Sequence, residues 1–413
     1  MNNRVLIISC NCFSQTSNNG KTLLNLFKNW KDESVYQFYT HNELPDFANN
    51  YNLFRITDAD IINLKLHKAI RCGSEIKSFG DATQSGATKK HFFEHLLREL
   101  RDILWSGKEW YYKGLNDWVE KASPDLIFFV GLNNPYLYKY CIFLQKKLGI
   151  PVIIYVTDDY LHPKLSFSPF YWIRLYKIRK CFKGLANSNT AIITINEIMN
   201  AQYSRLFKNP CYILTNYVVS PFKDYSLSGE AIKKITYVGN LLHGRWKTII
   251  KFSRLLMGKP YIIEVFPGNS LNRRIEKRIR KESNIVLGGL LDAAGVREKI
   301  LSADYVLHVE SFSYSDVCLA RYSLSTKITE YAAFCRPIIA YCPREVASYK
   351  ILKMNKMAIC LDKLTRNELS TVLNDEDYLK EIVKNAYEYF DSQRKKYHME
   401  DLISNIYVDL IKA

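Results

Sequence analysis

Short apolar runs recur along the chain, and each is followed by a polar loop and an amphipathic helical stretch. The first is residues 4–9 (R-V-L-I-I-S). In the first half of the chain, similar runs follow at residues 35–39, 126–130, 152–156, 191–195 and 211–214. Strands covered on both faces of a parallel sheet have such unbroken apolar runs, because neither face meets water. The pattern predicts an α/β fold built from Rossmann-like units.

The same alternation starts again after a polar stretch at residues 223–230 (K-D-Y-S-L-S-G-E), which is expected to be a linker. Strands are then expected at residues 235–238, 261–264, 285–287, 305–309 and 338–341. Because 413 residues exceed what one hydrophobic core usually holds, two domains are expected, at residues 1–220 and 221–395. A last helix at residues 396–413 is expected to pack back on the first domain. Residues 60–122 are expected to be mostly helical, with a break at residues 80–86.

Basic residues outnumber acidic ones, 58 to 41, which gives a formal net charge of +17. Such an excess indicates an anionic partner, whether a phosphate-bearing substrate, an anionic membrane surface or nucleic acid. The basic residues are spread over the whole chain, and no RNA-recognition motif, zinc finger or helix-turn-helix signature is visible. Nucleic-acid binding is therefore not expected.

The ten cysteines are scattered, and none forms a C-x-x-C pair; Cys10 and Cys12 make an isolated C-x-C. This usage predicts buried, reduced thiols in a cytosolic protein. The N-terminus runs straight into a strand, and no apolar run approaches the roughly 20 residues that span a bilayer. The expected location is the cytoplasm, with the inner face of the cell membrane as an alternative.

Gly20, Lys21 and Thr22 look like the end of an ATPase phosphate loop. The first glycine of that motif would stand five residues before Gly20, where this chain has Gln15. The ATPase interpretation is rejected on this ground, and the dinucleotide-binding pattern G-x-G-x-x-G is absent too. An amphipathic helix is expected to begin after this loop.

Residues 323–341 (S-L-S-T-K-I-T-E-Y-A-A-F-C-R-P-I-I-A-Y) have the layout of a loop, a short helix and a buried strand. Ser325 or Thr326 can cap the helix, and Pro337 stops it. Glu330 then lies just past a helix N-terminus, where phosphates are favoured and a carboxylate one turn in suits a ribose diol. An ordinary surface helix is the alternative for this stretch alone.

Asp158 and Asp159 follow the strand at residues 152–156, and ligands of parallel α/β sheets bind at such strand ends. Alternatively, one of the two carboxylates caps the next helix. Farther on, the helix expected at residues 170–183 combines a core face with exposed basic and aromatic residues. These are Trp172, Tyr176, Lys177, Lys180 and Lys183. Basic residues among aromatic ones suit an anionic bilayer surface, and a solvated face is the alternative.

Two Rossmann-like halves leave a cleft that suits a reaction between a donor held by one half and an acceptor held by the other. The second half resembles the donor domain of GT-B glycosyltransferases, the large family of retaining enzymes related to glycogen and lipopolysaccharide synthases. Four segments carry the resemblance, at residues 235–247, 284–288, 302–305 and 325–337. In the first half, the run from residue 192 to Asn216 and the loop to Gly20 resemble their counterparts.

The resemblance implies the GT-B fold, in which two Rossmann-like domains face each other across a cleft. The first domain would bind the acceptor and the second the nucleotide sugar. The implied reaction moves a sugar, with retention, from a nucleotide diphosphate sugar to a growing polysaccharide or a lipid-linked glycan. Asp158, Asp159 and Tyr160 resemble the D-D-Y of a subgroup of bacterial capsule and O-antigen transferases, which implies surface polysaccharide biosynthesis.

The resemblance also assigns roles to single residues. Arg245 and Lys247 would neutralise the departing diphosphate, and Asp158 or Asp159 would orient the acceptor hydroxyl or stabilise a cationic sugar. Glu330 would bind the ribose. Further nucleotide-sugar contacts are expected from Gly20, Gly239, Asn240, Ser325, Thr326 and Lys327. Contacts with the acceptor or the membrane are expected from His162, Trp172, Tyr176, Lys177 and Lys180. No cofactor and no metal are expected, since no D-x-D triplet is apparent.

Some positions depart from the family pattern. Tyr322 stands where relatives with paired glutamates carry the first glutamate, and Glu310 lies much further upstream at a strand end. Cys335 replaces a glycine that ends the helix in a conformation glycine adopts freely. Two other functions are compatible with the same fold, namely a nucleotide-sugar epimerase and a non-catalytic subunit of a glycan assembly complex.

Overall fold

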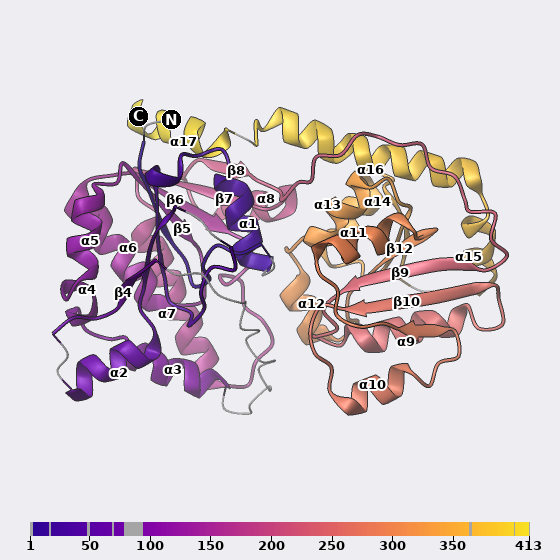
Figure 1. The fold of residues 1–413 in the computed structure, drawn as a ribbon, viewed down its shortest axis with the longest axis horizontal. Helices are drawn as coiled ribbons and strands as arrows, with labels where there is room; N and C mark the ends of the chain where they lie inside the picture. The colour runs from indigo at the N-terminus through magenta and orange to yellow at the C-terminus, as the bar shows by residue number, and fades with distance from the viewer. Residues whose placement is uncertain are drawn as a thin grey trace. The chain divides into compact units, whose positions relative to one another are not determined.

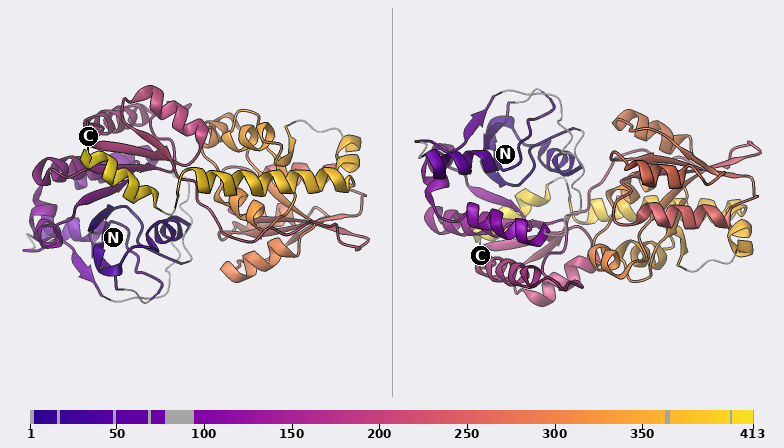
Figure 2. Two further views of the ribbon diagram at one scale, coloured as in Figure 1. Left: turned by 90° about the horizontal axis from the view of Figure 1, so that it is seen from above. Right: turned by 90° about the horizontal axis from the view of Figure 1, so that it is seen from below.

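The structure, a computed structural model, describes residues 3–15, 18–47, 50–67, 70–77, 94–362, 366–399 and 401–412. The chain divides into two compact units. Unit 1 comprises residues 1–214 and 398–413, and unit 2 comprises residues 215–397. Each unit is built around a mainly parallel sheet with helices on both faces (Figures 1 and 2). The expected α/β class with two Rossmann-like bodies is thereby confirmed.

Unit 1 has a sheet of eight described strands in the order β4-β3-β2-β1-β5-β6-β7-β8. The strands are β1 (Val5–Ile8), β2 (Val35–Tyr39), β3 (Asn52–Arg55), β4 (Ser74–Ile76), β5 (Leu126–Val130), β6 (Val152–Val156), β7 (Thr190–Thr194) and β8 (Cys211–Ile213). Strand β4 pairs antiparallel with β3, and the other pairings are parallel. The chain winds outward from β1 in one direction and from β5 in the other, so the switch point lies between them.

The helices of unit 1 connect these strands. They are α1 (Asn18–Phe27), α2 (Asp58–His67), α3 (Glu94–Leu104), α4 (Glu109–Tyr112), α5 (Leu115–Ala122), α6 (Pro135–Leu148), α7 (Pro169–Leu185), α8 (Glu197–Leu206) and the C-terminal α17 (Leu402–Lys412). Although α17 is remote in sequence, it packs against β7. Its buried positions include Leu402, Ile403 and Ile406, which are spaced to form one apolar face.

Unit 2 has a sheet of six described strands in the order β11-β10-β9-β12-β13-β14. The strands are β9 (Lys233–Gly239), β10 (Tyr261–Pro267), β11 (Ile285–Leu287), β12 (Tyr305–Val309), β13 (Ile338–Tyr341) and β14 (Ala358–Leu361). The helices are α9 (Arg245–Leu255), α10 (Arg273–Ile279), α11 (Ala293–Leu301), α12 (Tyr314–Ala320), α13 (Thr326–Ala333), α14 (Ala347–Met354), α15 (Arg366–Leu373) and α16 (Glu376–Lys396). The strand order reverses between β9 and β12.

Several strands have the bounds expected from the apolar runs, namely β2, β5, β6, β11, β12 and β13. All residues of β5 and β12, for example, are buried, as strands inside a covered sheet should be. Strands β3 and β4 were not expected, because both are short and neither has a long apolar run. The break expected at residues 80–86 lies outside the described residues.

Residues 223–230, expected to be a linker, instead pack on unit 2. Tyr225 is buried in the core of the unit, and its hydroxyl donates to the carbonyl of Asp304 at 2.9 Å. The Asp304 carboxylate accepts from the amides of Ser228 at 3.1 Å and Lys234 at 2.8 Å. These hydrogen bonds tie the stretch to unit 2, and the chain passes between the units at residues 214 and 215.

Gly20 lies within the first turn of α1, because this helix begins earlier than expected. A Cβ at Gly20 would lie 2.5 Å from the carbonyl oxygen of Cys12 and 2.7 Å from Cβ of Ser14. Such distances are too short for any side chain, so glycine is required where the loop after β1 crosses the start of α1. The structure thus gives Gly20 a packing role.

Candidate functional site

In unit 2, the carboxyl ends of β9 and β12 meet at the switch point, where open parallel sheets bind ligands. Glu310 directly follows β12, and Arg245 is the first residue of α9. The guanidinium of Arg245 joins the two sides of the switch point. Its Nε donates to Glu310 Oε2 at 3.0 Å, and its Nη2 donates to Glu310 Oε1 at 2.9 Å. Its Nη1 donates to Asn240 Oδ1 at 2.7 Å.

This ion pair places a partly buried cation beside a buried carboxylate at the switch point. The Glu310 residue is 7% exposed, and the Arg245 side chain is 21% exposed. Burial alone would lower the pKa of Arg245, but the neighbouring Glu310 carboxylate raises it, so the cation is retained. Three of the five N–H donors of the guanidinium serve these contacts. The geometry therefore holds Arg245 rigidly and leaves donor capacity for anionic oxygens of a ligand.

The turn before α9 is held tightly against the segment after Glu310. Gly244 caps α9 with a φ of +72°, in the left-handed region that glycine adopts without strain. A Cβ at Gly244 would lie 2.7 Å from Ser311 Oγ and 3.2 Å from Asp316 Oδ2. Only glycine fits at this close contact with Ser311 and Asp316. The contact therefore fixes the position of the first turn of α9, which begins at Arg245.

Helix α13 starts with the cap expected from the sequence. Ser325 is the N-cap residue, and its hydroxyl accepts from the Lys327 amide at 3.4 Å. Glu330 Oε2 accepts from Lys327 Nζ at 2.9 Å, and the Glu330 side chain is 12% exposed. Thr326 is exposed in the first turn. The carboxylate of Glu330 is thus partly buried, held by one lysine, and placed one turn inside a helix N-terminus.

A buried tyrosine ties α13 to the switch point. Tyr331 is 1% exposed, and its hydroxyl donates to the carbonyl of Val238 at 3.4 Å. Val238 lies near the end of β9, directly before Gly239 and Asn240. Through this contact and the Asn240–Arg245 bond, the structure brings the Glu330 helix, the strand-end turn and Arg245 into one connected group.

The end of α13 explains why Cys335 is tolerated. Cys335 has a φ of +53°, and the amides of Cys335 and Arg336 donate to the carbonyls of Ala332 at 3.0 Å and Tyr331 at 3.1 Å. These are the two bonds of a Schellman motif, in which the left-handed residue is usually glycine. The Cys335 sulfur accepts from the Lys223 amide at 3.4 Å. The thiol thus anchors the segment that was expected to be a linker.

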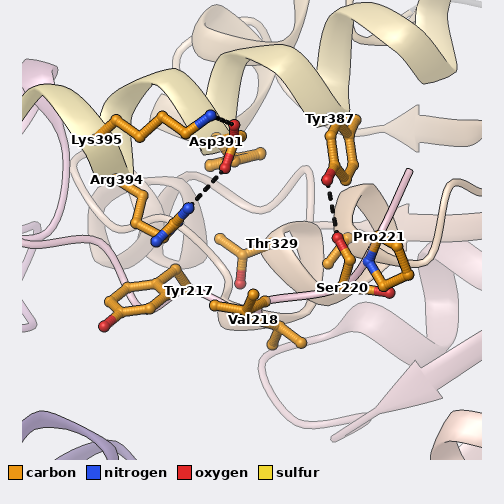
Figure 3. A pocket seen from close by; sticks show the side chains of 12 residues that line it. Tyr217, Val218, Ser220, Pro221, Thr329, Tyr387, Asp391, Arg394 and Lys395 are labelled. Carbon is orange, nitrogen blue, oxygen red and sulfur yellow. Dashed lines mark hydrogen bonds and ion pairs between the residues drawn. The ribbon is translucent and has the colours of Figure 1, made fainter. Parts of the chain in front are cut away.

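A pocket of about 320 Å³ lies behind α13, among the side chains drawn in Figure 3. It is lined by residues 217–221, α13 and α16. The hydroxyl of Tyr387 donates to the carbonyl of Ser220 at 2.8 Å, and Asp391 pairs with Arg394 at 3.0 Å and Lys395 at 2.6 Å. From α13 the pocket is lined by Thr329 and Ala333, whereas Glu330 and Ser325 do not line it. The pocket is therefore separate from the group formed by Arg245, Asn240 and Glu330.

Lys247 does not join Arg245 at the switch point. Residues two apart on a helix do not share a face, and Lys247 is exposed with its ammonium 5.5 Å from the ring centroid of Trp246. The structure thus separates the two cations that were expected to act together.

In unit 1, the two adjacent acids after β6 differ sharply. Asp158 is exposed, whereas Asp159 is 2% exposed. Asp159 Oδ1 accepts from the Leu161 amide at 3.2 Å, the His162 amide at 3.3 Å and the Tyr203 hydroxyl at 3.4 Å, and lies 3.0 Å from His162 Nδ1. Burial would raise the pKa of Asp159, but these hydrogen bonds and His162 lower it overall. Asp159 therefore organises the loop after β6, and Asp158 is the acid that is exposed to solvent.

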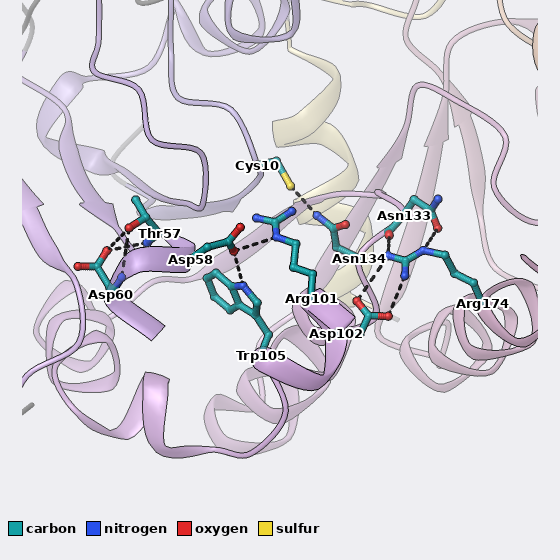
Figure 4. Close-up of polar contacts among 10 residues, drawn as sticks. All are labelled: Cys10, Thr57, Asp58, Asp60, Arg101, Asp102, Trp105, Asn133, Asn134 and Arg174. Carbon is teal, nitrogen blue, oxygen red and sulfur yellow. Dashed lines mark hydrogen bonds and ion pairs between the residues drawn. The ribbon is translucent and has the colours of Figure 1, made fainter. Parts of the chain in front are cut away.

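The switch point of unit 1 carries polar residues that sequence reasoning missed (Figure 4). Asn134 Nδ2 donates to Cys10 Sγ at 2.8 Å, which joins the segments that follow β5 and β1. Nearby, Asp58 Oδ1 accepts from Arg101 Nε at 2.8 Å and from Trp105 Nε1 at 2.6 Å. These partners are 43 and 47 residues apart in sequence, so no local pattern could have indicated the cluster.

A buried cation lies beside this cluster. Arg174 of α7 donates to Asn133 Oδ1 at 3.0 Å and pairs with Asp102 at 2.9 Å. It is 4% exposed, so it holds α3 and α7 together. Lys177, expected to face the acceptor or a membrane, pairs with Glu99 of α3 instead.

The remaining residues of that expected surface are exposed. Trp172 is 48% and Tyr176 66% exposed, and Lys180 is exposed beside them. His162 is only 19% exposed at its side chain, because it closes the Asp159 loop. The α7 surface is thus aromatic and basic, whereas His162 closes the Asp159 loop and Lys177 is paired with Glu99.

The described ranges contain neither a candidate metal site nor a candidate membrane span. Among these residues, no group of three or more His, Cys, Asp and Glu side chains is placed to hold a metal ion. No helix within the described ranges is long and apolar enough to cross a bilayer. Of the ten cysteines, seven are buried and three partly buried, and all are free thiols.

No family model and no curated protein sequence matches this chain. Solved structures do match over nearly the whole length. Sucrose-phosphate synthase from Thermosynechococcus elongatus has a TM-score of 0.65 at 11% identity, with 99% of each chain covered. Anabaena Alr3699/HepE, solved with UDP and glucose, has a TM-score of 0.60 at 11% identity, covering 98% of this chain and 100% of its own. WaaG, a glycosyltransferase involved in lipopolysaccharide biosynthesis, has a TM-score of 0.57 at 10% identity, covering 98% and 99%. The chain therefore has the GT-B fold that glycosyltransferases of this kind share.

Proposed function

We propose that the protein is a glycosyltransferase that moves a sugar from a nucleotide diphosphate sugar to a growing polysaccharide or lipid-linked glycan, with retention. Unit 2 would bind the donor and unit 1 the acceptor. The observation that carries the proposal is the connected group at the switch point of unit 2, where Arg245 and the Glu330 helix meet the end of β9. A cation and a helix N-terminus suit a diphosphate, and a carboxylate one turn away suits a ribose.

The proposed mechanism relies on charge at the leaving group. As the bond from the sugar to the diphosphate breaks, negative charge grows on the departing phosphate oxygens. Arg245, oriented by Glu310 and Asn240, would stabilise that charge at no cost of reorganisation, aided by the amides that open α13 after Ser325. Lys247 is exposed and would stabilise the departing diphosphate only at longer range, through the positive potential of its ammonium group. We expect that no metal is needed, since these groups already neutralise the negative charge of the diphosphate.

Asp158 is the proposed acceptor-side residue. It is exposed at the carboxyl end of β6, so its carboxylate could orient an acceptor hydroxyl or stabilise a sugar with cationic character. Asp159 would act through the loop that carries Asp158, because its oxygen is occupied by the Leu161 and His162 amides. Asp159 is thus a positioning residue in this proposal.

The acceptor is proposed to belong to bacterial surface polysaccharide biosynthesis. The D-D-Y sequence at residues 158–160 supports this, as does the fold likeness to WaaG. A uridine nucleotide is a reasonable first donor to test, because HepE was solved with UDP and glucose. The exposed aromatic and basic surface of α7, with Trp172, Tyr176 and Lys180, supports peripheral contact with an anionic membrane.

Thermal denaturation with UDP-, GDP- and dTDP-sugars tests the donor first. The preferred donor should raise the melting temperature, and the same donor should then give transfer to an added glycan. Conversion of the donor to another free nucleotide sugar without any glycan would instead indicate an epimerase. If no nucleotide sugar stabilises the protein, the transferase proposal is wrong.

Vesicle sedimentation tests the membrane contact. Charge reversal at Lys180 together with Lys183 should reduce pelleting with anionic vesicles, because each lysine near such a surface contributes about 1 kcal/mol. Charge reversal at Lys177 should have less effect, since this lysine already pairs with Glu99. Unchanged pelleting of the Lys180 and Lys183 double variant would contradict the contact.

A further inference from the structure

A second pocket, of about 560 Å³, lies in unit 1 among the end of α3, α4, α6 and α7. Its walls are largely aromatic, from Trp105, Trp110, Tyr111, Tyr136, Tyr140 and Phe143. The rings of Trp105 and Tyr136 stack at 4.4 Å with an interplanar angle of 18°, and those of Tyr111 and Phe143 lie 5.0 Å apart. This volume lies within the range of about 300–1,000 Å³ that is usual for small-molecule sites.

Several polar atoms around this pocket already have partners within the protein. Trp105 Nε1 donates to Asp58 at 2.6 Å, and Asp102 pairs with Arg174 at 2.9 Å (Figure 4). The Tyr140 hydroxyl donates to Asn116 Oδ1 at 3.2 Å. A sugar in the pocket would have to give up hydrogen bonds to water without regaining them from these groups, which is costly. The ring faces that remain favour a hydrocarbon chain.

The rim of the pocket is positively charged. Lys108 and Lys139 line it and are exposed, and Lys177 lines it while paired with Glu99. The carboxylate that lines the pocket, Asp102, is neutralised by Arg174. The head of a bound amphiphile would therefore meet lysines, whose ammonium groups favour a phosphate.

Helix α3 presents an apolar stripe to solvent at the mouth of this pocket. Leu97, Leu100 and Ile103 recur every third residue and are 51%, 52% and 63% exposed. The charged residues of the same helix turn inward, since Glu99 pairs with Arg174. Helices of soluble proteins normally bury the apolar face, so the reversed arrangement marks a surface that meets an apolar partner. Ile103 belongs to both the stripe and the pocket lining.

We infer that this pocket binds the hydrocarbon chain of an anionic lipid whose phosphate lies at Lys108 and Lys139. The stripe on α3 would rest against the bilayer from which the lipid comes. The inference deepens the proposed transferase function and rests on it in one respect, because it identifies the acceptor as a lipid-linked glycan. The binding itself requires neither donor nor transfer.

Calorimetric titration of the full chain with dodecyl phosphate, below its micelle concentration, tests the inference. Octyl phosphate, inorganic phosphate and dodecyl maltoside serve as probes of chain length and head charge. Each buried methylene should raise the affinity about fourfold, so dodecyl phosphate should bind at least tenfold more tightly than octyl phosphate. Inorganic phosphate and dodecyl maltoside should bind much more weakly.

A charge-reversal pair locates the site. The double variant Lys108→Glu and Lys139→Glu should bind dodecyl phosphate at least tenfold more weakly. The matched control Lys208→Glu changes an exposed lysine of the same unit that does not line the pocket, and it should bind as the wild type does. All three substitutions are at exposed positions, so folding should be retained.

Equal affinity for octyl and dodecyl phosphate, equal affinity for dodecyl maltoside, or unchanged binding by the double variant would each overturn the inference. Nucleoside diphosphate binding, measured in the same preparation, separates the two proposals. A protein that binds the nucleotide but not dodecyl phosphate has a donor site without the lipid pocket. A protein that binds dodecyl phosphate but no nucleotide refutes the transferase proposal alone.

Discussion

Arg245 and Glu310 form a bidentate ion pair across the switch point of the second sheet, with N–O distances of 3.0 and 2.9 Å. They are 65 residues apart in sequence and become neighbours because β9 and β12 are adjacent. Glu310 thus supports the residue proposed to bind the diphosphate.

The first prediction concerns the stability of this pair. Arg245→Met should lower the free energy of unfolding by up to about 3 kcal/mol, because it leaves the buried Glu310 carboxylate unpaired. The double variant Arg245→Met and Glu310→Gln should recover much of the loss. Urea denaturation measures both.

The control for that experiment is Arg280→Met. Arg280 pairs with Glu276 at 3.0 Å, and the two side chains are 55% and 40% exposed. An ion pair with both partners exposed contributes less than about 1 kcal/mol, so this variant should change little. An equal loss in the Arg245 and Arg280 variants would mean that burial of the Glu310 pair has no special effect.

The second prediction separates Asp158 from Asp159. Asp158→Asn should leave stability nearly unchanged and reduce transfer, whereas Asp159→Asn should reduce stability, because it weakens the hydrogen bonds of a buried loop. The folded-state pKa of Asp159 is lowered. Its contribution to stability is therefore full above the unfolded pKa of about 3.9 and lost as the pH falls below it.

Chemical denaturation between pH 3 and 7 checks this assignment. The stability of the Asp159→Asn variant should fall less with acid than that of the wild type, and the Asp158→Asn variant should follow the wild type. The opposite order of the two variants would reverse their assigned roles.

The third prediction concerns Cys335 at the end of α13. A left-handed conformation costs a non-glycine residue about 1 kcal/mol, and the buried sulfur with its bond from Lys223 returns a similar amount. Cys335→Gly should therefore remain within about 1 kcal/mol of the wild type. Cys335→Val should be clearly less stable, because a branched side chain fits this conformation poorly. Equal stability of the two variants in thermal unfolding would argue against the strain.

The fourth prediction is a pH dependence from His308 of β12. Burial lowers the pKa of His308 to about 3, with Arg245 as a second cause, and its Nε2 lies 3.0 Å from Ser348 Oγ. Because the unfolded pKa is about 6.5, the neutral form favours the folded state. The stability it contributes is full above pH 6.5 and decreases as the pH falls from 6.5 towards 3. The variant His308→Gln should show a flatter stability profile over that range, and a profile parallel to that of the wild type would exclude His308 as the cause.

The fold could be predicted further than the site. Buried strands such as β5 and β12 carry unbroken apolar runs, so their bounds followed from local composition. Strand β3, with only four residues and two of them buried, has no comparable signal. The cap at Ser325 was likewise local, since its partner is two residues away.

The site depends on pairings between remote residues. Glu310 acquires its role only when β12 lies beside β9, and Lys177 is redirected only because α3 packs on α7. The sequence alone also could not show which of the two adjacent acids is buried. In the structure, Asp159 is buried in the loop after β6, whereas Asp158 is exposed. Local sequence patterns identified candidate residues. Their hydrogen bonds and their burial depend on contacts with segments that are remote in sequence.

The most direct test of the central claim combines two nucleotides with two proteins. The preferred nucleoside diphosphate and its 2′,3′-dideoxy analogue are titrated by calorimetry into the wild type and the Glu330→Ala variant. If Glu330 binds the ribose diol, the wild type should prefer the natural nucleotide about tenfold or more, since a charged hydrogen bond is worth about 1.5–3 kcal/mol. The variant should bind both nucleotides with the same weaker affinity. A Glu330→Ala variant that still prefers the natural nucleotide as strongly as the wild type would contradict the account.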